Sequence, residues 1–274
     1  MSQNEKENCI ITEKQKILFK NRELTLQEKI PIEIVEFLKI KFEKILMAFS
    51  GGSDSTLLLL LLIESKQINC IDTIIFNNTR LQSPEIFRYI DTIIERFDLK
   101  EKFVTIKPNY SRKQLLKIIE EDIANVTGKK HSKHLYRCCV LAKEKPMNKY
   151  LKENELESEK TVLLRGIRAN ESSQRFMTCL QMIRSGQFYC NKPRYNKKIY
   201  VSNPLALMTE QVKWKLLKKL CQKYNIPLPK KSGCIYCPIF AKFDSKTDLE
   251  RIMKLNKFLN QSNISSYIKE DNYG

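Results

Sequence analysis

Short apolar runs alternate with amphipathic stretches along most of the chain. The runs have the length and composition of buried strands, and they predict strands over 45–49, 71–76, 103–107, 161–165 and 198–202. Apolar residues at helical spacing predict helices between and after them, over 32–42, 56–64, 84–97, 111–124, 170–184 and 209–224. Alternation of strands with helices is typical of a parallel sheet covered by helices.

The stretch 56–64 sharpens this prediction because it has leucine on every helical face. Such a helix is buried on several sides, as at the centre of a doubly wound sheet. We therefore expect an α/β fold with a doubly wound, mostly parallel sheet and helices on both faces. The expected organisation is a polar N-terminal extension over 1–30, an α/β domain over 31–240 and a short helical C-terminal tail over 241–274.

The segment between the first strand and the leucine-rich helix has the chemistry of a phosphate-binding loop. It reads Ser50, Gly51, Gly52, Ser53, Asp54, Ser55, Thr56. Glycines let backbone amides approach an anion closely, and the N-terminus of the following helix favours negative charge. Ser50, Ser55 and Thr56 add hydroxyl donors, and Asp54 suits Mg²⁺ or the fixing of the loop. The segment is not a Walker A motif, because it lacks the Gly-Lys-Ser/Thr end of that motif. An ordinary serine-glycine turn that caps a helix is the alternative interpretation of the segment.

Charge adds one further expectation. The chain of 274 residues carries a net charge of +18, which favours a polyanionic partner such as tRNA or DNA. Lysine greatly outnumbers arginine and is spread along the whole chain, so a general compositional bias is an equally open interpretation.

The longest apolar run is too short to cross a bilayer, and the N-terminus has no signal-peptide pattern, so we expect a cytoplasmic protein with no membrane partner.

Several motifs between about residues 45 and 240 resemble one protein family. The loop at 50–56 is similar to the PP-loop of the adenine nucleotide alpha hydrolase-like ATP pyrophosphatase superfamily, which splits ATP between its α and β phosphates. The segments 77–85, 138–146, 166–175, 203–210 and 233–238 resemble motifs of the phosphoadenylyl-sulfate (PAPS) reductase family within it, which includes the sulfur-transfer enzyme of DNA phosphorothioation.

The resemblance implies a set of site residues. Asp54, Lys143 and Arg168 would be catalytic, and Lys143 would lie near the substrate phosphate or a cluster. The nucleotide would be bound by Ser50, Gly51, Gly52, Ser53, Asp54, Ser55, Thr56, Thr79, Arg168, Glu171 and Arg175. The chain departs from the family pattern at Asn78 and Arg80, which replace an acid and a glycine, and at Ser53, where many relatives carry lysine.

The resemblance also selects four of the nine cysteines as a ligand set, namely Cys138, Cys139, Cys234 and Cys237. Four thiolates can hold a [4Fe–4S] cluster or a zinc ion, and redox-active or unliganded thiols are a third reading. Adjacent cysteines suit two corners of a cluster better than one tetrahedral ion. Cys70, Cys179 and Cys221 sit in apolar patterns typical of core positions. Cys190 lies in a basic loop, where it is either a sulfur carrier or an incidental thiol.

Three functions follow from these features. The first is an ATP-dependent sulfurtransferase that needs Mg²⁺, releases AMP and pyrophosphate, and passes sulfur from a donor protein to an acceptor, with tRNA or DNA as candidate acceptors. The second is a reductase of adenylyl sulfate or its 3′-phosphorylated form, which ranks lower because no cysteine follows Cys237. The third is a subunit that binds nucleotide and cluster without turnover.

Overall fold

The computed structural model describes residues 24–126, 137–171, 175–177, 179, 190, 192, 198–230 and 232–233. The chain divides into two compact units. We call residues 1–77, 84–106 and 147–232 the sheet unit, and residues 78–83, 107–146 and 233–274 the small unit. The predicted helical tail over 241–274 lies outside the described residues.

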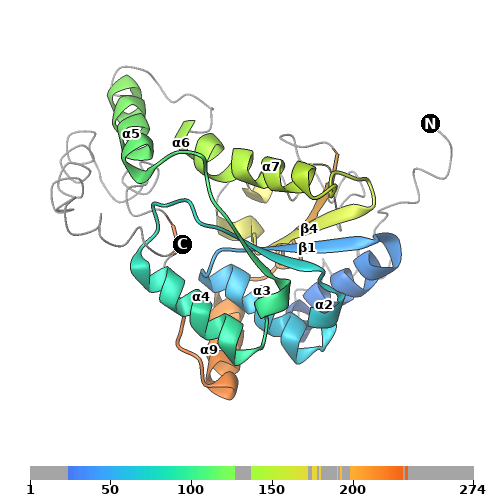
Figure 1. The fold of residues 1–274 in the computed structure, drawn as a ribbon. Helices are drawn as coiled ribbons and strands as arrows, with labels where there is room; N and C mark the ends of the chain where they lie inside the picture. Colours follow the sequence, from blue (N-terminus) through green and yellow to red (C-terminus); the bar gives the residue numbers. More distant parts are fainter. Residues whose placement is uncertain are drawn as a thin grey trace. The chain divides into compact units, whose positions relative to one another are not determined.

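The sheet unit is built on five parallel strands (Figure 1). Their order across the sheet is β3-β2-β1-β4-β5, and all neighbouring pairs are parallel. The strands are β1 (Lys44–Phe49), β2 (Thr73–Asn77), β3 (Phe103–Ile106), β4 (Thr161–Arg165) and β5 (Tyr200–Ser202). Each observed strand overlaps a predicted one, and the predicted fold class is confirmed, because the apolar runs are buried in the sheet.

The strand order places a topological switch point at β1. From β1 the chain winds to β2 and β3 on one side, and it then returns to place β4 and β5 on the other side. Loops that leave the carboxyl ends of β1 and β4 diverge at such a point, and open α/β sheets bind their ligands in the crevice there. The segment at residues 50–56 leaves the carboxyl end of β1, so the fold presents it where a ligand is expected.

The helices of the sheet unit overlap predicted ones and differ from them at their ends, except for the helix at residues 145–153, which was not predicted. They are α2 (Leu24–Lys41), α3 (Ser53–Glu64), α4 (Pro84–Arg96), α7 (Lys145–Glu153, of which residues 147–153 belong to this unit) and α9 (Glu210–Tyr224). The expected start of the first helix after Pro31 is wrong, since α2 continues through that proline. The fixed φ of proline is compatible with a helix even though its nitrogen donates no hydrogen bond. In the part of the chain that the structure describes, no helix is long and apolar enough to cross a membrane.

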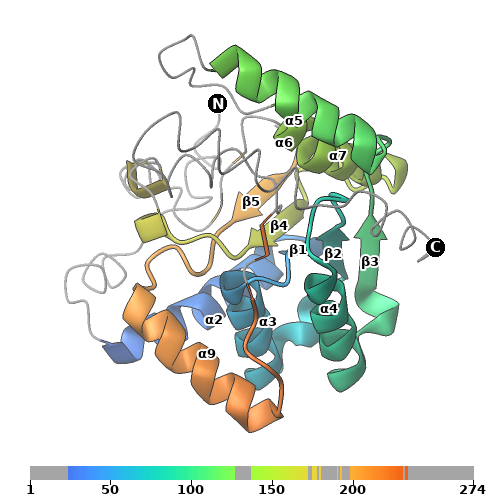
Figure 2. The same ribbon diagram turned by 90° about the vertical axis from the view of Figure 1, so that its left-hand side faces the viewer.

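Two apolar cores cover the two faces of the sheet. On one face α2, α3, α4 and α9 pack together (Figure 2), and residues 57–62 of α3, all leucine, are at most 5% exposed. On the other face Leu151 of α7 packs against Leu46, Leu163 and Val201 of the strands. The prediction of helices on both faces is therefore confirmed, and α3 is the central helix of the larger core.

The small unit has its own apolar core. It contains α5 (Arg112–Val126) and α6 (Arg137–Cys139), which continues through a π-helical segment (Val140–Glu144). Buried side chains hold these segments together; they are Leu81, Leu115, Ile119, Cys138 and Ala142. The pair Cys138 and Cys139 thus lies in a helix that the sequence analysis did not predict.

Helix α2 offers a matched test of this packing. Ile34 is 1% exposed and Ile40 is 89% exposed on the same helix. We expect Ile34→Ala to lower the free energy of unfolding by about 2–5 kcal/mol, because it deletes buried methyl groups and leaves a cavity. Ile40→Ala should change it by less than about 0.5 kcal/mol. Urea denaturation of both variants measures the difference, and equal effects would contradict the described packing of α2.

Candidate phosphate-binding site

The loop after β1 turns sharply at Gly51 and enters α3 directly. Gly51 has a φ of 72°, a left-handed conformation that favours glycine. Gly52 is the N-cap residue of α3, which begins at Ser53. The helix was predicted to start at residue 56, and this start is wrong: Asp54, Ser55 and Thr56 form the first helical turn. Because α3 begins three residues earlier than predicted, its first N–H groups lie beside the glycine turn. These groups have no acceptor within the helix.

Serine side chains hold the loop in shape. The Ser55 hydroxyl donates to the Gly52 carbonyl over 3.1 Å and accepts from the Ser50 amide over 3.2 Å. The Gly52 amide in turn donates to the Ser50 hydroxyl over 3.3 Å. Ser55 and Thr56 are buried, whereas Ser53 is partly exposed and Ser50 is exposed. These hydrogen bonds preorganise the loop.

Gly166, which follows β4, brings a second loop against the first. A Cβ atom at this position would lie 2.7 Å from the Ser55 amide nitrogen and 2.8 Å from the Asp54 carbonyl carbon. Contacts this short with backbone leave no room for a side chain, so glycine is required there. The close approach places Arg168 next to Asp54.

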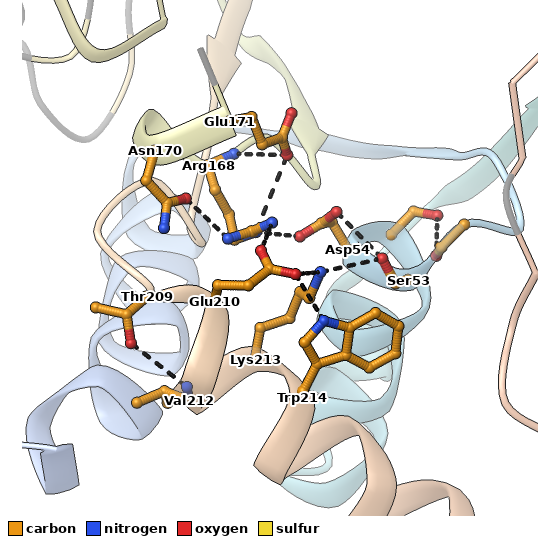
Figure 3. A network of polar contacts seen from close by, with 12 residues as sticks. Ser53, Asp54, Arg168, Asn170, Glu171, Thr209, Glu210, Val212, Lys213 and Trp214 are labelled. Atoms are coloured by element: carbon orange, nitrogen blue, oxygen red, sulfur yellow. Dashed lines mark hydrogen bonds and ion pairs between the residues drawn. The ribbon is translucent and has the colours of Figure 1, made fainter. Parts of the chain in front are cut away.

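Arg168 lies at the centre of a network of polar contacts (Figure 3). It is 3% exposed, and its Nε atom donates to the Asp54 carboxylate. Its Nη2 atom lies 2.5 Å from Glu210 Oε2, and its Nη1 atom donates to Asn170 Oδ1 over 2.8 Å. Glu171 completes the network, with one oxygen 4.0 Å from Arg168 Nε. The structure thus brings together Asp54, Arg168 and Glu171, three of the predicted site residues.

Arg175 extends this network through its ion pair with Glu171. Partial burial lowers the pKa of Arg175 most, the neighbouring charges of Arg165 and Arg168 lower it further, and the charge of Asp54 acts in the opposite direction. The three arginines are therefore close enough to repel one another, as in a site that concentrates positive charge for an anion.

Helix α9 supplies functional residues that the sequence analysis missed. Lys213 is 3% exposed; its Nζ atom lies 2.6 Å from Glu210 Oε1 and 3.5 Å from Ser53 Oγ of the loop. The Trp214 Nε1–H also donates to Glu210 Oε1, over 2.6 Å. A signal existed: Lys213 follows Val212 on the apolar side of an amphipathic helix, where an ammonium group needs a partner.

Glu210 holds the side chains of Arg168 and Lys213 in place. Partial burial raises the pKa of Glu210, but the hydrogen bond from Lys213 and the charge of Arg168 outweigh this, so its pKa is lowered overall. The carboxylate therefore stays ionised at neutral pH and keeps both cations beside the loop. Position 53 is a serine in this chain. Lys213 of α9 brings an ammonium group next to that serine.

A second missed residue, Ser232, contacts the loop from the segment after α9. Its hydroxyl lies 3.2 Å from Ser50 Oγ, and a Cβ on Gly52 would lie 2.3 Å from Ser232 Oγ. Lys230 anchors the same segment to α4 through Glu85, over 2.8 Å. A side chain at position 52 would displace the Ser232 hydroxyl, so Gly52 leaves the space in which Ser232 reaches the loop.

The remaining predicted site residues belong to the other unit. Thr79 and Lys143 belong to the small unit. Thr79 is 2% exposed, and its amide and hydroxyl both donate to Gln82 Oε1, over 2.9 and 2.8 Å. Their predicted contacts with the nucleotide stay predictions.

The predicted ligand set is described in part. Cys138 is buried, the neighbouring Cys139 is partly exposed, and Cys234 and Cys237 lie outside the described residues. Among the residues that the structure describes, no group of three or more metal-binding side chains gathers. The cluster and the zinc ion therefore both stay predictions.

Three other cysteines lie in the core of the sheet unit, namely Cys179, Cys190 and Cys221. Burial raises the pKa of Cys179, and it raises the pKa of Cys221 to about 11. Cys190 is 1% exposed. A sulfur carrier needs an accessible thiolate, so the core position of Cys190 favours the reading of an incidental thiol.

The chain matches one known family model over most of its length. Residues 44–237, more than half of the chain, match the model of the phosphoadenosine phosphosulfate reductase domain. The chain belongs to this family. The match begins at β1 and ends at Cys237, so it includes the loop, Arg168, α9 and all four predicted ligand cysteines. No curated protein matches the chain.

The solved structures that are similar to the chain include three enzymes from different organisms. Phosphoadenylyl-sulfate reductase from Candida auris, in a phosphate complex, has 15% identity and a TM-score of 0.47, over 76% of this chain and 89% of that chain. The NH3-dependent NAD synthetase from Campylobacter jejuni has 16% identity and a TM-score of 0.42, over 86% and 94%. The U34-tRNA thiolase NcsA from Methanococcus maripaludis, with its [4Fe–4S] cluster, has 17% identity and a TM-score of 0.44, over 85% and 80%.

Lys213 can be tested as a ligand of the phosphate site. We expect Lys213→Met to weaken binding of inorganic pyrophosphate by about 1.5–3 kcal/mol, the usual value of a charge-assisted hydrogen bond. The fold should persist, because Glu210 keeps its contacts with Arg168 and Trp214. Isothermal titration measures the Kd, and Lys219→Met, an exposed lysine on the same helix, is the control. An unchanged Kd in a folded Lys213→Met protein would remove Lys213 from the site.

Proposed function

We propose that this protein binds ATP with its β and γ phosphates in the loop of residues 50–56 and cleaves it to AMP and pyrophosphate. One observation carries the proposal: Arg168 and Lys213, both buried, lie beside the N-terminus of α3 and are held there by the same carboxylate. A pyrophosphate leaving group gains charge as the α–β bond breaks. Preorganised cations and helix N–H groups stabilise such charge most effectively.

The proposed reaction is an adenylyl transfer. An oxygen of the acceptor attacks the α phosphorus, the bond from that phosphorus to the α–β bridging oxygen breaks, and the electron pair leaves with pyrophosphate. Sulfur then displaces AMP from the adenylated acceptor. Arg168 and Lys213 are the groups proposed to bind the leaving pyrophosphate, together with Mg²⁺. Asp54 orients Arg168 through their ion pair, and Lys143 is proposed as a further catalytic residue.

A [4Fe–4S] cluster is part of the proposal. Cys138 and Cys139 place two thiols at adjacent helical positions, about 100° apart around the helix axis. Thiols that diverge in this way, one buried and one partly exposed, fit two corners of a cluster at the edge of an apolar core. We propose that Cys234 and Cys237 complete the ligand set, with zinc as the alternative metal. The cluster would supply a place to hold or relay sulfur.

A second candidate function is supported by the family itself. The phosphoadenosine phosphosulfate reductase domain is named for a sulfonucleotide substrate. The cations around Arg168 can bind a sulfate or a phosphate equally well, because both present planar pairs of anionic oxygens to a guanidinium. The sulfonucleotide would then be reduced by two electrons from a thiol donor, sulfite and the nucleoside phosphate would be released, and ATP would not be cleaved.

The test is to follow the products from ATP and from a sulfonucleotide. We expect the anaerobically purified protein to release AMP and pyrophosphate from Mg-ATP, and more in the presence of the acceptor. Arg168→Lys should lower this rate about 100-fold, since a lysine cannot pair with Asp54 and Glu210 at once. Arg88→Lys, an exposed arginine on α4, is the matched control and should keep the full rate.

The alternative outcomes separate the three functions. Sulfite from adenylyl sulfate or its 3′-phosphorylated form, with no AMP from ATP, would establish the reductase instead. Tight ATP binding without turnover in either assay would establish a non-catalytic subunit. In both cases the proposed ATP cleavage is wrong.

The cluster has its own test. We expect the anaerobic protein to be brown, with broad visible absorbance and bound iron, and Cys138→Ser to lose both. Cys70→Ser, at a partly exposed position outside the ligand set, should keep the colour. A colourless protein that contains zinc by metal analysis would replace the cluster with the alternative metal.

A further inference from the structure

The single tryptophan of the chain lies at the surface beside the phosphate site. Trp214 is partly exposed on α9. It borders an open hollow of about 540 Å³ that is lined by Glu210, Gln211, Trp214 and Lys218. A large aromatic ring next to an open hollow is a surface on which a flat ligand can stack.

The orientation of the indole ring is fixed by the phosphate-site network. Its N–H donates to Glu210 over 2.6 Å, and the Lys213 ammonium lies 4.3 Å from the ring centroid (Figure 3). The same Glu210 carboxylate contacts Arg168. A ligand stacked on Trp214 would therefore be one side chain away from the cations proposed to bind the pyrophosphate.

The surroundings of the hollow favour an anionic ligand. Lys215 directly follows Trp214 on α9, Lys218 lies one helical turn beyond it, and both are exposed. The negative charge of Glu210 is compensated by Arg168 and Lys213. Proteins that bind single-stranded nucleic acid combine this pair of features, an aromatic platform for the bases and cations for the backbone. The net charge of +18 is consistent with such a partner.

We propose that the hollow binds a base of a single-stranded nucleic acid, stacked on Trp214, with the flanking phosphates on Lys215 and Lys218. The inference rests on the proposed function, because the bound strand would be the acceptor that the adenylyl transfer activates. It specifies the acceptor further: an unpaired nucleotide is delivered beside the phosphate loop, since a base in a duplex has no exposed face to offer the ring.

The chain has a single tryptophan, so fluorescence excited selectively at the indole reports this position alone. We expect a single-stranded oligonucleotide to quench the fluorescence of the full chain saturably, also in the presence of excess pyrophosphate. An oligonucleotide of the same length and charge with abasic positions should bind more weakly and quench little. It controls for attraction by charge alone.

Two substitutions separate stacking from the hydrogen bond to Glu210. Trp214→Ala should weaken oligonucleotide binding, followed by fluorescence anisotropy of a labelled strand, by about 5- to 100-fold, as expected for the loss of one base–aromatic stack. Trp214→Phe keeps a ring but loses the N–H donor, and it should retain most of the affinity. Pyrophosphate affinity is measured for each variant, so that damage to the Glu210 network is seen separately.

Three results would overturn the inference. Oligonucleotide binding without quenching would place the strand elsewhere, and no oligonucleotide binding would remove the partner. Equal quenching by AMP, with competition against the oligonucleotide, would assign the hollow to the base of the bound nucleotide. The proposed function and this inference can fail separately. If the strand stacks on Trp214 but ATP is not cleaved, only the proposed function is wrong. If ATP is cleaved but no strand stacks on Trp214, only this inference is wrong.

Discussion

The buried guanidinium of Arg168 is the constraint on which the candidate site depends. A charged group that is 3% exposed is very unfavourable unless it is paired and hydrogen-bonded. Its partners come from separate elements: Asp54 from α3, Asn170 and Glu171 from the segment after β4, and Glu210 from α9. Satisfying one side chain therefore fixes three elements relative to one another, and the same contacts shape the loop that follows β1.

This arrangement explains how cations can stay next to an anion site before the anion arrives. Unpaired arginine and lysine side chains would repel one another and turn to solvent, whereas Glu210 holds Arg168 and Lys213 at once. A phosphate ligand then meets donors already in position, and little reorganisation is needed on binding. The carboxylates of Asp54 and Glu171 balance part of the positive charge, so affinity for an anion depends on geometry as well as on net charge.

Helix α9 joins the two proposed activities. Its first turns place Glu210 and Lys213 against the phosphate loop, and the next residue, Trp214, borders the surface hollow. Nucleotide and acceptor would therefore be positioned by one rigid element, as adenylyl transfer requires, because the attacking oxygen and the α phosphorus must be brought together in a fixed orientation. The family match covers this helix but does not choose between ATP and a sulfonucleotide.

The sequence by itself determined the strands, the loop and the pair Arg168 and Glu171, because these depend on local patterns: apolar runs, glycine next to serine, and a short motif after a strand. It did not reveal Lys213 or Ser232, which are one lysine and one serine among many. Their contacts with Ser53 and Ser50 join residues 160 and 182 positions apart. Such contacts depend on strand order and on the packing of α9 against α3, and tertiary structure alone decides both, since local periodicity carries no information about which distant elements become neighbours.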